Sequence, residues 1–149
     1  MTTEFLNCIS LIKRLYDLIL EPVCGQYEIT RMEMDILLFL HNHPEYDTAT
    51  DIIKKRRLTK SHVSSSIKLL EKHHYIERSY QGNNGKTIHL RVTNDAARIV
   101  NAGLTAQREF YEILFSDFTE EQVRAMERNL KKLTDNVQTA LTGGNRHDL

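Results

Sequence analysis

The chain has no long apolar run and very little cysteine. Its longest uninterrupted apolar segment is residues 36–40, Ile-Leu-Leu-Phe-Leu, far short of the roughly 20 residues that a membrane-spanning helix needs. The first residues, Met-Thr-Thr-Glu, carry no basic segment, so we expect no secretory signal. Two cysteines, Cys8 and Cys24, are too few for a disulfide framework. We therefore expect a reduced, cytoplasmic setting and no membrane partner.

The sequence also lacks the short motifs that mark common enzyme sites. It has no Gly-rich phosphate loop, no nucleophile elbow and no HExxH zinc motif. Aspartate and histidine occur without a recognised catalytic spacing. These absences predict a protein that is not an enzyme and that has no resident cofactor.

Charge is unevenly distributed along the chain. The 149 residues are 40% apolar, enough for a core, and the formal net charge is zero. Residues 45–93, however, hold ten Lys or Arg against five Asp or Glu, whereas the rest of the chain holds ten against fifteen. A basic middle between acidic ends suggests a module that faces a polyanion. A solvated charged surface is the alternative explanation.

Periodicity and capping residues predict three helices in the first part of the chain. Apolar residues recur at steps of three and four over residues 4–24, around so much of the helix that one neighbour would not cover them. We expect Pro22 to end or kink this helix. Thr30 and Glu33 fit a capping box that opens a second helix, which stops before Pro44. Asp47 or Thr48 can cap a short third helix that runs to Arg56.

The second part of the chain predicts a helix, a hairpin and two further helices. Thr59 caps a helix over residues 60–73, with Val63, Ile67 and Leu70 toward the core. Alternating segments at 76–80 and 87–92 form a hairpin joined by residues 82–85. Thr93 or Asn94 caps a fifth helix, in which we expect apolar contacts from Ala97, Val100, Leu104, Phe110, Ile113 and Leu114. Thr119 and Gln122 form another capping box, and the last helix stops at Gly143-Gly144 before a tail expected to be disordered.

The order short helix, tight turn, second helix and two-stranded hairpin is that of a winged helix-turn-helix. In this motif the second helix enters the DNA major groove, so its outer face needs small hydrogen-bonding groups and cations. The helix 60–73 offers four serines and two lysines there: Ser61, Ser64, Ser65, Ser66, Lys60 and Lys68. A solvent-exposed face is the alternative, but such faces usually prefer Glu, Lys or Gln to serine.

Two further basic segments flank this helix. The quartet at residues 54–57, Lys-Lys-Arg-Arg, suits contacts with phosphates, although such quartets also occur as localisation signals or solubilising surfaces. The hairpin carries Arg78, Lys86, His89 and Arg91. Lys86 is nearest the tip and is the favoured minor-groove contact. Arg78 either reaches phosphate or braces the hairpin, and Arg91 is equally well an ordinary strand residue.

Residues 30–96 resemble the MarR family of bacterial transcription regulators. The matching stretches are Thr30-x-x-Glu33 leading into Ile36-Leu37-Leu38, then residues 58–64 (LTKSHVS), Leu70-Glu71-Lys72, residues 75–78 (YIER) and residues 90–93 (LRVT). The resemblance implies a mainly α fold with a small β-wing. In this fold one domain covers 1–149, the winged helix-turn-helix covers 30–93, and residues 4–25 and 94–142 form dimerisation helices.

The resemblance also implies a function. It predicts a homodimer that binds a pseudo-palindromic operator in double-stranded DNA, acts as a repressor and is released by a small-molecule effector or an oxidant. The expected DNA contacts are Lys54, Lys55, Arg57, Thr59, Lys60, Ser61, His62, Ser64, Ser65, Lys68, Arg78 and Lys86. A winged-helix module that docks on protein is the alternative, and it would require an apolar or acidic outer face.

The chain departs from the family pattern at three places. The wing's usual Asp-x-Arg is Asn84-Gly85-Lys86, which keeps the positive charge but loses the planar guanidinium and its acidic partner. His74 replaces the glycine that often ends the recognition helix, and histidine tolerates a left-handed backbone better than most residues. Ala96 stands where a glycine is expected after Thr93.

Cys8 and a group of histidines and carboxylates are candidate sensors. Cys8 lies on the first helix, where some relatives place an oxidant-sensing thiol, but Arg31 stands where those relatives carry a tyrosine, so a buried structural thiol is the favoured interpretation. His41 and His43, with Glu45 and Asp47 nearby, resemble part of a metal site. We expect no metal there, because the fifth helix offers no histidine as a further ligand.

Overall fold

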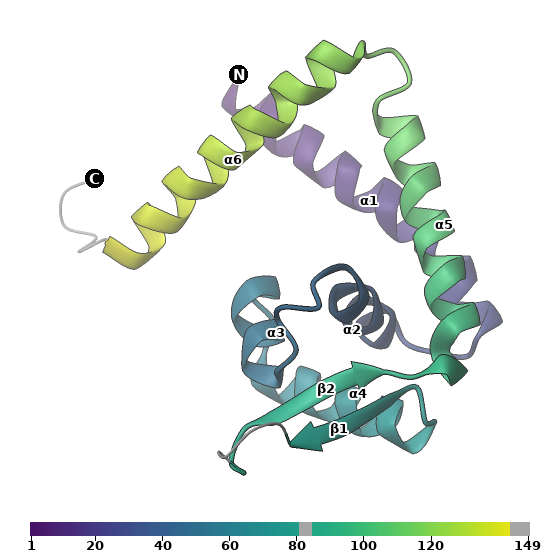
Figure 1. Ribbon diagram of the computed structural model, residues 1–149. Helices are drawn as coiled ribbons and strands as arrows, with labels where there is room; N and C mark the ends of the chain where they lie inside the picture. Colours follow the sequence, from purple (N-terminus) through teal and green to yellow (C-terminus); the bar gives the residue numbers. More distant parts are fainter. Residues whose placement is uncertain (81–84, 144–149) are drawn as a thin grey trace. The chain divides into compact units, whose positions relative to one another are not determined.

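The computed structural model describes residues 1–80 and 85–143. Its elements are α1 (Thr2–Gln26), α2 (Arg31–Asn42), α3 (Ala49–Arg56), α4 (Lys60–Lys72), β1 (Ile76–Tyr80), β2 (Ile88–Val92), the 3₁₀ turn η1 (Asn94–Ala96), α5 (Ala97–Leu114) and α6 (Glu120–Gly143) (Figure 1). The predicted order of helices and hairpin is confirmed. Across the described ranges, none of the helices combines the length and apolar character needed to cross a membrane.

The chain divides into two compact units, Met1–Tyr111 and Glu112–Leu149. The first holds α1–α4, the hairpin and most of α5. The second holds the end of α5 and all of α6. No residue of α6 is buried, and its apolar side chains are exposed at helical spacing: Met126, Leu130, Leu133, Val137 and Leu141.

Capping boxes begin the helices where the sequence predicts them. At α2 the Glu33 N–H donates to Thr30 Oγ1 (3.1 Å), and the Thr30 N–H donates to Glu33 Oε2 (2.8 Å). Thr48 and Asp51 make the same reciprocal pair at α3, which selects Thr48 over Asp47 as the cap. In the second unit, the Gln122 N–H donates to Thr119 Oγ1. Each box satisfies N–H groups that the first helical turn leaves without partners.

Two expectations about helix ends are met only in part. Pro22 does not end α1, which continues to Gln26 and buries Cys24 in the added turn. Thr93 is the N-cap residue of the turn η1, which precedes α5, but its side chain makes no capping bond, because its hydroxyl donates instead to the His74 carbonyl (2.5 Å). Burial of Cys24 stabilises the turn after Pro22, and the Thr93 hydroxyl fastens β2 to the end of α4.

Three helices end on a non-glycine residue in the left-handed region. Glu28 after α1 has φ 52°, Arg57 after α3 has φ 52° and His74 after α4 has φ 60°. At α4 the Tyr75 N–H donates to the Leu70 carbonyl and the His74 N–H to the Glu71 carbonyl, each at a distance of 2.9 Å. This is the Schellman arrangement, which usually has glycine at the left-handed position. The expectation that histidine can replace that glycine is confirmed.

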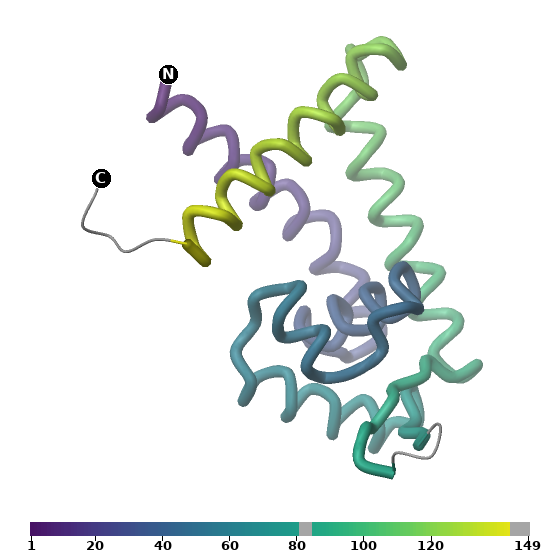
Figure 2. Tube along the Cα trace, turned by 60° about the vertical axis from the view of Figure 1, so that its left-hand side comes forward, coloured from purple at the N-terminus to yellow at the C-terminus, as the bar shows by residue number. Residues whose placement is uncertain are grey.

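The core of the first unit lies where α2 meets α1, α4 and the hairpin. Leu37, Ile52, Val63 and Leu70 are fully buried in it. Figure 2 shows α3 and α4 side by side, joined by a short turn, with α2 beside them. The prediction for α5 was only partly right, because Val100 is buried but Ala97 is exposed and the buried set is Ile99, Val100, Gly103 and Ala106.

Gly103 explains why the apolar pattern of α5 misleads. A Cβ at this position would lie 2.8 Å from Met34 Sδ and 2.9 Å from Leu38 Cδ2. At Gly103 the helix therefore meets α2 without a side chain of its own. Small residues at a contact let two helix backbones approach closely.

The hairpin is antiparallel and is fastened at its base and along β2. Ile76 pairs with Val92, Arg78 with Leu90 and Tyr80 with Ile88. At the base the Thr93 N–H donates to the Tyr75 carbonyl (3.0 Å). The predicted joining turn, residues 82–85, and the expected disordered tail lie largely outside the described residues.

Replacement of His74 by glycine should stabilise the protein. An L-residue at φ 60° is strained, and glycine is not, so we expect the free energy of unfolding to rise by about 0.5–1 kcal/mol after the entropy of the more flexible unfolded chain is counted. Urea denaturation followed by circular dichroism measures it. His73→Gly is the control, since His73 has φ −86°. An equal gain in both variants would contradict the strain at His74.

Candidate nucleic-acid interface

One face of α4 is fixed by the core, and the opposite face is therefore presented to solvent. Val63, Ile67 and Leu70 are buried at 3% exposure or less. The predicted contact residues lie on the other side: Lys60, Ser61, His62, Ser65 and Lys68 are exposed, and Ser64 is half-buried. Thr59 is exposed at the N-cap. The structure brings these six α4 residues and the cap together on one helix surface.

Ser66 does not belong to this surface. Its exposure is only 6%, and it lies with Val63 and Leu70 on the core side of α4. Positions 63, 66 and 70 are separated by three and four residues, so they share one side of a helix. The predicted four-serine cluster is therefore wrong by one residue, and Ser61, Ser64 and Ser65 remain on the outer face.

A groove separates α4 from the hairpin. It encloses about 320 Å³ and is lined by Ala49, Ser64, Ile67, Lys68, Arg78, Ile88 and Leu90. Ser64 and Lys68 of α4 and Arg78 of β1 all belong to this lining. α4 and the hairpin thus present polar and cationic groups toward the same groove.

The basic quartet does not act as a unit. Lys54 and Arg57 are exposed at the end of α3. Lys55 Nζ lies 4.2 Å from the centre of the Tyr46 ring, in a cation–π contact. Arg56 Nη2 lies 3.9 Å from Asp35 Oδ1 of α2. Two of the four cations therefore turn toward α2 and the loop after it, a division that a run of like charges in the sequence does not reveal.

The two arginines of the wing also have different acidic partners. Arg78 donates from Nη2 to Glu71 Oε2 (2.8 Å) and from Nε to the other oxygen, and this hydrogen bond is the main cause of a raised Arg78 pKa. Arg91 makes an ion pair with Glu77 across the hairpin, which is the ordinary strand role. Arg78 is thus paired with a residue of α4, which favours the bracing role over a phosphate contact.

The remaining wing residues lie toward the tip or against the loop before α3. His89 Nδ1 lies 2.8 Å from Asp47 Oδ1, and the Leu90 N–H donates to the Asp47 carbonyl (2.7 Å). Lys86 is exposed next to the tip. Asn84, the expected substitute for the family's acidic wing residue, lies outside the described residues.

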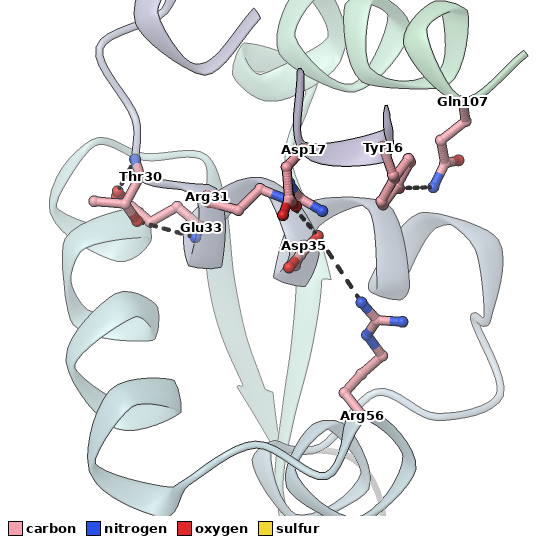
Figure 3. A network of polar contacts seen from close by, with 8 residues as sticks. All are labelled: Tyr16, Asp17, Thr30, Arg31, Glu33, Asp35, Arg56 and Gln107. Atoms are coloured by element: carbon pink, nitrogen blue, oxygen red, sulfur yellow. Dashed lines mark hydrogen bonds and ion pairs between the residues drawn. The ribbon is translucent and has the colours of Figure 1, made fainter. Parts of the chain in front are cut away.

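A polar network joins α1, α2 and α3 behind the helix-turn-helix. Arg31 donates to Asp17 Oδ1 of α1 (2.6 Å) and to Asp35 Oδ1 of α2 (3.1 Å), and its guanidinium lies 4.7 Å from the centre of the Tyr16 ring. Figure 3 shows Arg31 between the two carboxylates, with Arg56 reaching Asp35 from α3. Burial lowers the pKa of Arg31, but the carboxylates more than offset this, and the net shift is upward.

The sequence analysis missed this network, although one signal was present. Arg31 and Asp35 are spaced i,i+4 on a predicted helix, which is the spacing of a helical ion pair. Asp17 and Arg56 come from other elements, and no periodicity connects them to Arg31. Arg31, the residue after the Thr30 cap, is thus the centre of an ion-pair network.

A cavity of about 320 Å³ adjoins the network. Its lining combines aromatic rings with charged and amide groups: Tyr16, Asp35, Leu38, Phe39, Asn42, His43, Tyr46, Lys55, Arg56 and Gln107. Gln107 of α5 donates to the Tyr16 hydroxyl (2.9 Å) and accepts from Asn42 (3.2 Å). The cavity therefore lies among α1, α2, α3 and α5.

The two sensor candidates, the Cys8 thiol and the group around His41 and His43, do not have the surroundings that the sensor interpretations require. Cys8 is exposed, so the favoured interpretation of a buried thiol is wrong for Cys8. It applies instead to Cys24, whose pKa is raised chiefly by burial. His43 Nδ1 lies 3.7 Å from Glu45 Oε1. No three His, Cys, Asp or Glu side chains within residues 1–80 and 85–143 are placed to hold a metal ion.

Comparisons with known proteins agree with this architecture. Residues 27–85 match the model of the MarR family. S. aureus MepR in complex with DNA is 25% identical, with 92% of this chain and 96% of that chain covered and a TM-score of 0.72. A search of curated protein sequences gave no match.

Two structures of lower sequence identity share the fold. A putative MarR family regulator from Listeria monocytogenes, complexed with a 26mer DNA, has a TM-score of 0.81 at 20% identity, with 97% of each chain covered. A MarR regulator from Methanosarcina mazei Go1 has a TM-score of 0.75 at 20% identity, with 91% of each chain covered.

The family match covers the helix-turn-helix and the start of the wing, and the structural likeness to MepR extends over nearly the whole chain. The matching proteins are transcription regulators, so the expectation that the chain is not an enzyme is supported by its relatives. Residues 27–85 thus match the MarR family, and over nearly its whole length the chain is similar in fold to MepR and other MarR regulators, as expected for a winged helix-turn-helix.

Proposed function

We propose that the protein is a homodimeric repressor that binds a specific pseudo-palindromic operator in double-stranded DNA and is released by a small-molecule effector. The observation that carries the proposal is the polar outer face of α4, with Ser61, Ser64 and Lys68 opposite a buried apolar face. Small hydroxyls permit close approach to base edges, and the lysines meet phosphates. The DNA complex of MepR supports the proposal.

The proposed contacts fall into two kinds. Ser61, His62, Ser64 and Ser65 would face bases in the major groove. The cations and the cap would meet phosphates or the minor groove: Lys54, Lys55, Arg57, Thr59, Lys60, Lys68, Arg78 and Lys86. Lys55 and Arg78 are the weakest of these, because each already contacts a neighbouring side chain. A protein-docking role is disfavoured by the cations on this face.

Exposed apolar faces support the dimer. On α1 the side chains of Phe5, Leu6 and Ile9 are each about half exposed. On α6 the five apolar residues of the exposed row repeat at steps of three and four over about four turns. Contiguous apolar surface of this kind marks a protein–protein interface. A second copy would bring two recognition helices to the two half-sites of a palindrome.

The cavity among α1, α2, α3 and α5 suits an effector that is a small aromatic anion. Lys55 and Arg56 supply two positive charges, whereas Asp35 is the one carboxylate in the lining and is already paired with Arg31. Tyr16, Phe39 and Tyr46 supply ring faces. A ligand that draws on Lys55 or Arg56 would move the end of α3, next to Lys54 and Arg57.

Ser64→Glu should abolish specific binding. A carboxylate in the groove between α4 and the wing would face the DNA phosphates, which repel it. The measurement is a titration of a duplex that the wild-type protein selects from a random pool. Ser116→Glu makes the same charge change at an exposed residue outside the α4 surface. Retained affinity in Ser64→Glu would contradict the assignment of α4 as the recognition helix.

Lys86→Ala should weaken binding and flatten its salt dependence. Each phosphate contact contributes about −0.9 to the slope of log K against log salt, so loss of one contact reduces the slope by about that amount. Affinities at four salt concentrations measure the slope. Arg128→Ala, an equal charge change on α6, should leave it unchanged. An unaltered slope in Lys86→Ala would mean that the wing does not contact DNA through this residue.

Benzoate, used as a simple aromatic anion, should raise the melting temperature by a few degrees and release bound DNA, because a ligand stabilises the state that it binds. Benzylamine, of similar size and opposite charge, should do neither. Lys55→Gln should abolish the response, whereas its neighbour Lys54→Gln should retain it. Equal responses to both compounds would contradict an anion-selective cavity.

A further inference from the structure

An acidic residue occupies the surface that the proposed function assigns to DNA. Glu71 follows Ser64 by seven residues and Lys68 by three, so all three lie along one stripe of α4. A carboxylate next to a phosphate backbone is repelled by it. Electrostatics alone would therefore make Glu71 unfavourable for DNA binding, and its presence requires another explanation.

The geometry of Glu71 supplies one. Both of its oxygens accept from the Arg78 guanidinium, Oε1 from Nε at 2.5 Å and Oε2 from Nη2 at 2.8 Å. A paired contact of this kind fixes orientation as well as distance. Both side chains are partly shielded, with exposures of 27% for Glu71 and 37% for Arg78. The pair joins the last turn of α4 to the middle of β1.

The Glu71–Arg78 pair lies at the register position where the second strand of the wing, β2, is also bonded to a neighbouring segment. Arg78 is opposite Leu90 in the hairpin register. The Leu90 N–H donates to the Asp47 carbonyl (2.7 Å), which fastens β2 to the loop before α3. At this register position β1 is therefore tied to α4 and β2 to the α2–α3 loop. The bond from Thr93 to His74 lies three residues farther toward the base.

We propose that Glu71 is a positioning residue that holds the wing at a fixed angle to the recognition helix, so that α4 and the wing meet the major and minor grooves together. This inference rests on the proposed DNA-binding function. It assigns Arg78 to the brace, and it explains why a carboxylate is compatible with this surface: its charge is neutralised by the residue that it holds.

The variant Glu71→Gln separates positioning from simple charge. Removal of a negative charge should raise affinity for any DNA, whereas loss of the brace should lower affinity for the selected operator. We expect operator affinity to fall about tenfold, within the range of coupling between contacting residues, and affinity for scrambled DNA not to fall. Glu77→Gln is the matched control, because Glu77 pairs with Arg91 within the hairpin and does not reach α4.

Hydrogen exchange of the wing amides, measured without DNA, gives an independent readout. Glu71→Gln and Arg78→Gln should each accelerate exchange in β1 and β2, and Glu77→Gln should do so less. The exchanged pair Glu71→Arg with Arg78→Glu should restore slow exchange and part of the operator affinity. Helical circular dichroism establishes that each variant is folded.

Two results would overturn the proposal. Unchanged wing exchange in Glu71→Gln would show that the pair does not hold the wing. Tighter operator binding by Glu71→Gln would show that Glu71 merely withdraws Arg78 from the DNA. If the wild-type protein selects no DNA, the proposed function fails, but the exchange measurement still decides whether Glu71 fixes the wing.

Discussion

α4 packs against the rest of the winged helix through Val63, Ile67 and Leu70, and the opposite face of the helix is defined by that contact. A helix with one buried stripe has no freedom to rotate, because rotation would expose the stripe to water. Ser61, Ser64 and Lys68 face solvent for this reason, and Ser66, on the buried side, does not. Loss of the buried contact would free α4 to turn and would remove the surface that the proposed function requires.

The other elements hold α4 and the wing as one body. The left-handed end of α4 at His74 turns the chain directly into β1, and Thr93 returns β2 to the same point. Behind the helix-turn-helix, Arg31 links α1 to α2, and Asp35 extends the link to Arg56 on α3. A ligand bound in the cavity beside Arg56 would therefore displace the end of α3. Under the proposed function, this is the physical route by which an effector would act on the proposed DNA contacts.

Local rules predict the elements of this fold well. Thr30 with Glu33 and Thr119 with Gln122 begin helices as predicted, and the apolar spacing in residues 60–73 identifies the buried face of α4. These features depend on residues three or four apart, so the sequence contains them directly. The family resemblance at residues 58–64 and 75–78 then connects the elements to a winged helix.

Other features depend on partners that are distant in the chain. Pro22 lies within α1 because tertiary burial of Cys24 stabilises one more turn, and Gly103 marks a close approach of α5 to α2 that periodicity does not reveal. The quartet at residues 54–57 divides because Tyr46 and Asp35 happen to lie beside two of its members. Cys8 is exposed although it lies on an apolar helix. In each case the residue's surroundings are set by segments that are distant in the chain, and local sequence patterns do not reveal those contacts.

Operator recognition is tested by measuring how tightly the purified protein binds its own upstream intergenic DNA and scrambled DNA, at 50 and 200 mM salt, with its mass in solution determined alongside. We expect a dimer that binds the upstream DNA more tightly than scrambled DNA. Its affinity should fall about 10³-fold between the two salt concentrations, as several phosphate contacts require. Failure to bind any DNA, even at the lower salt, would contradict operator recognition.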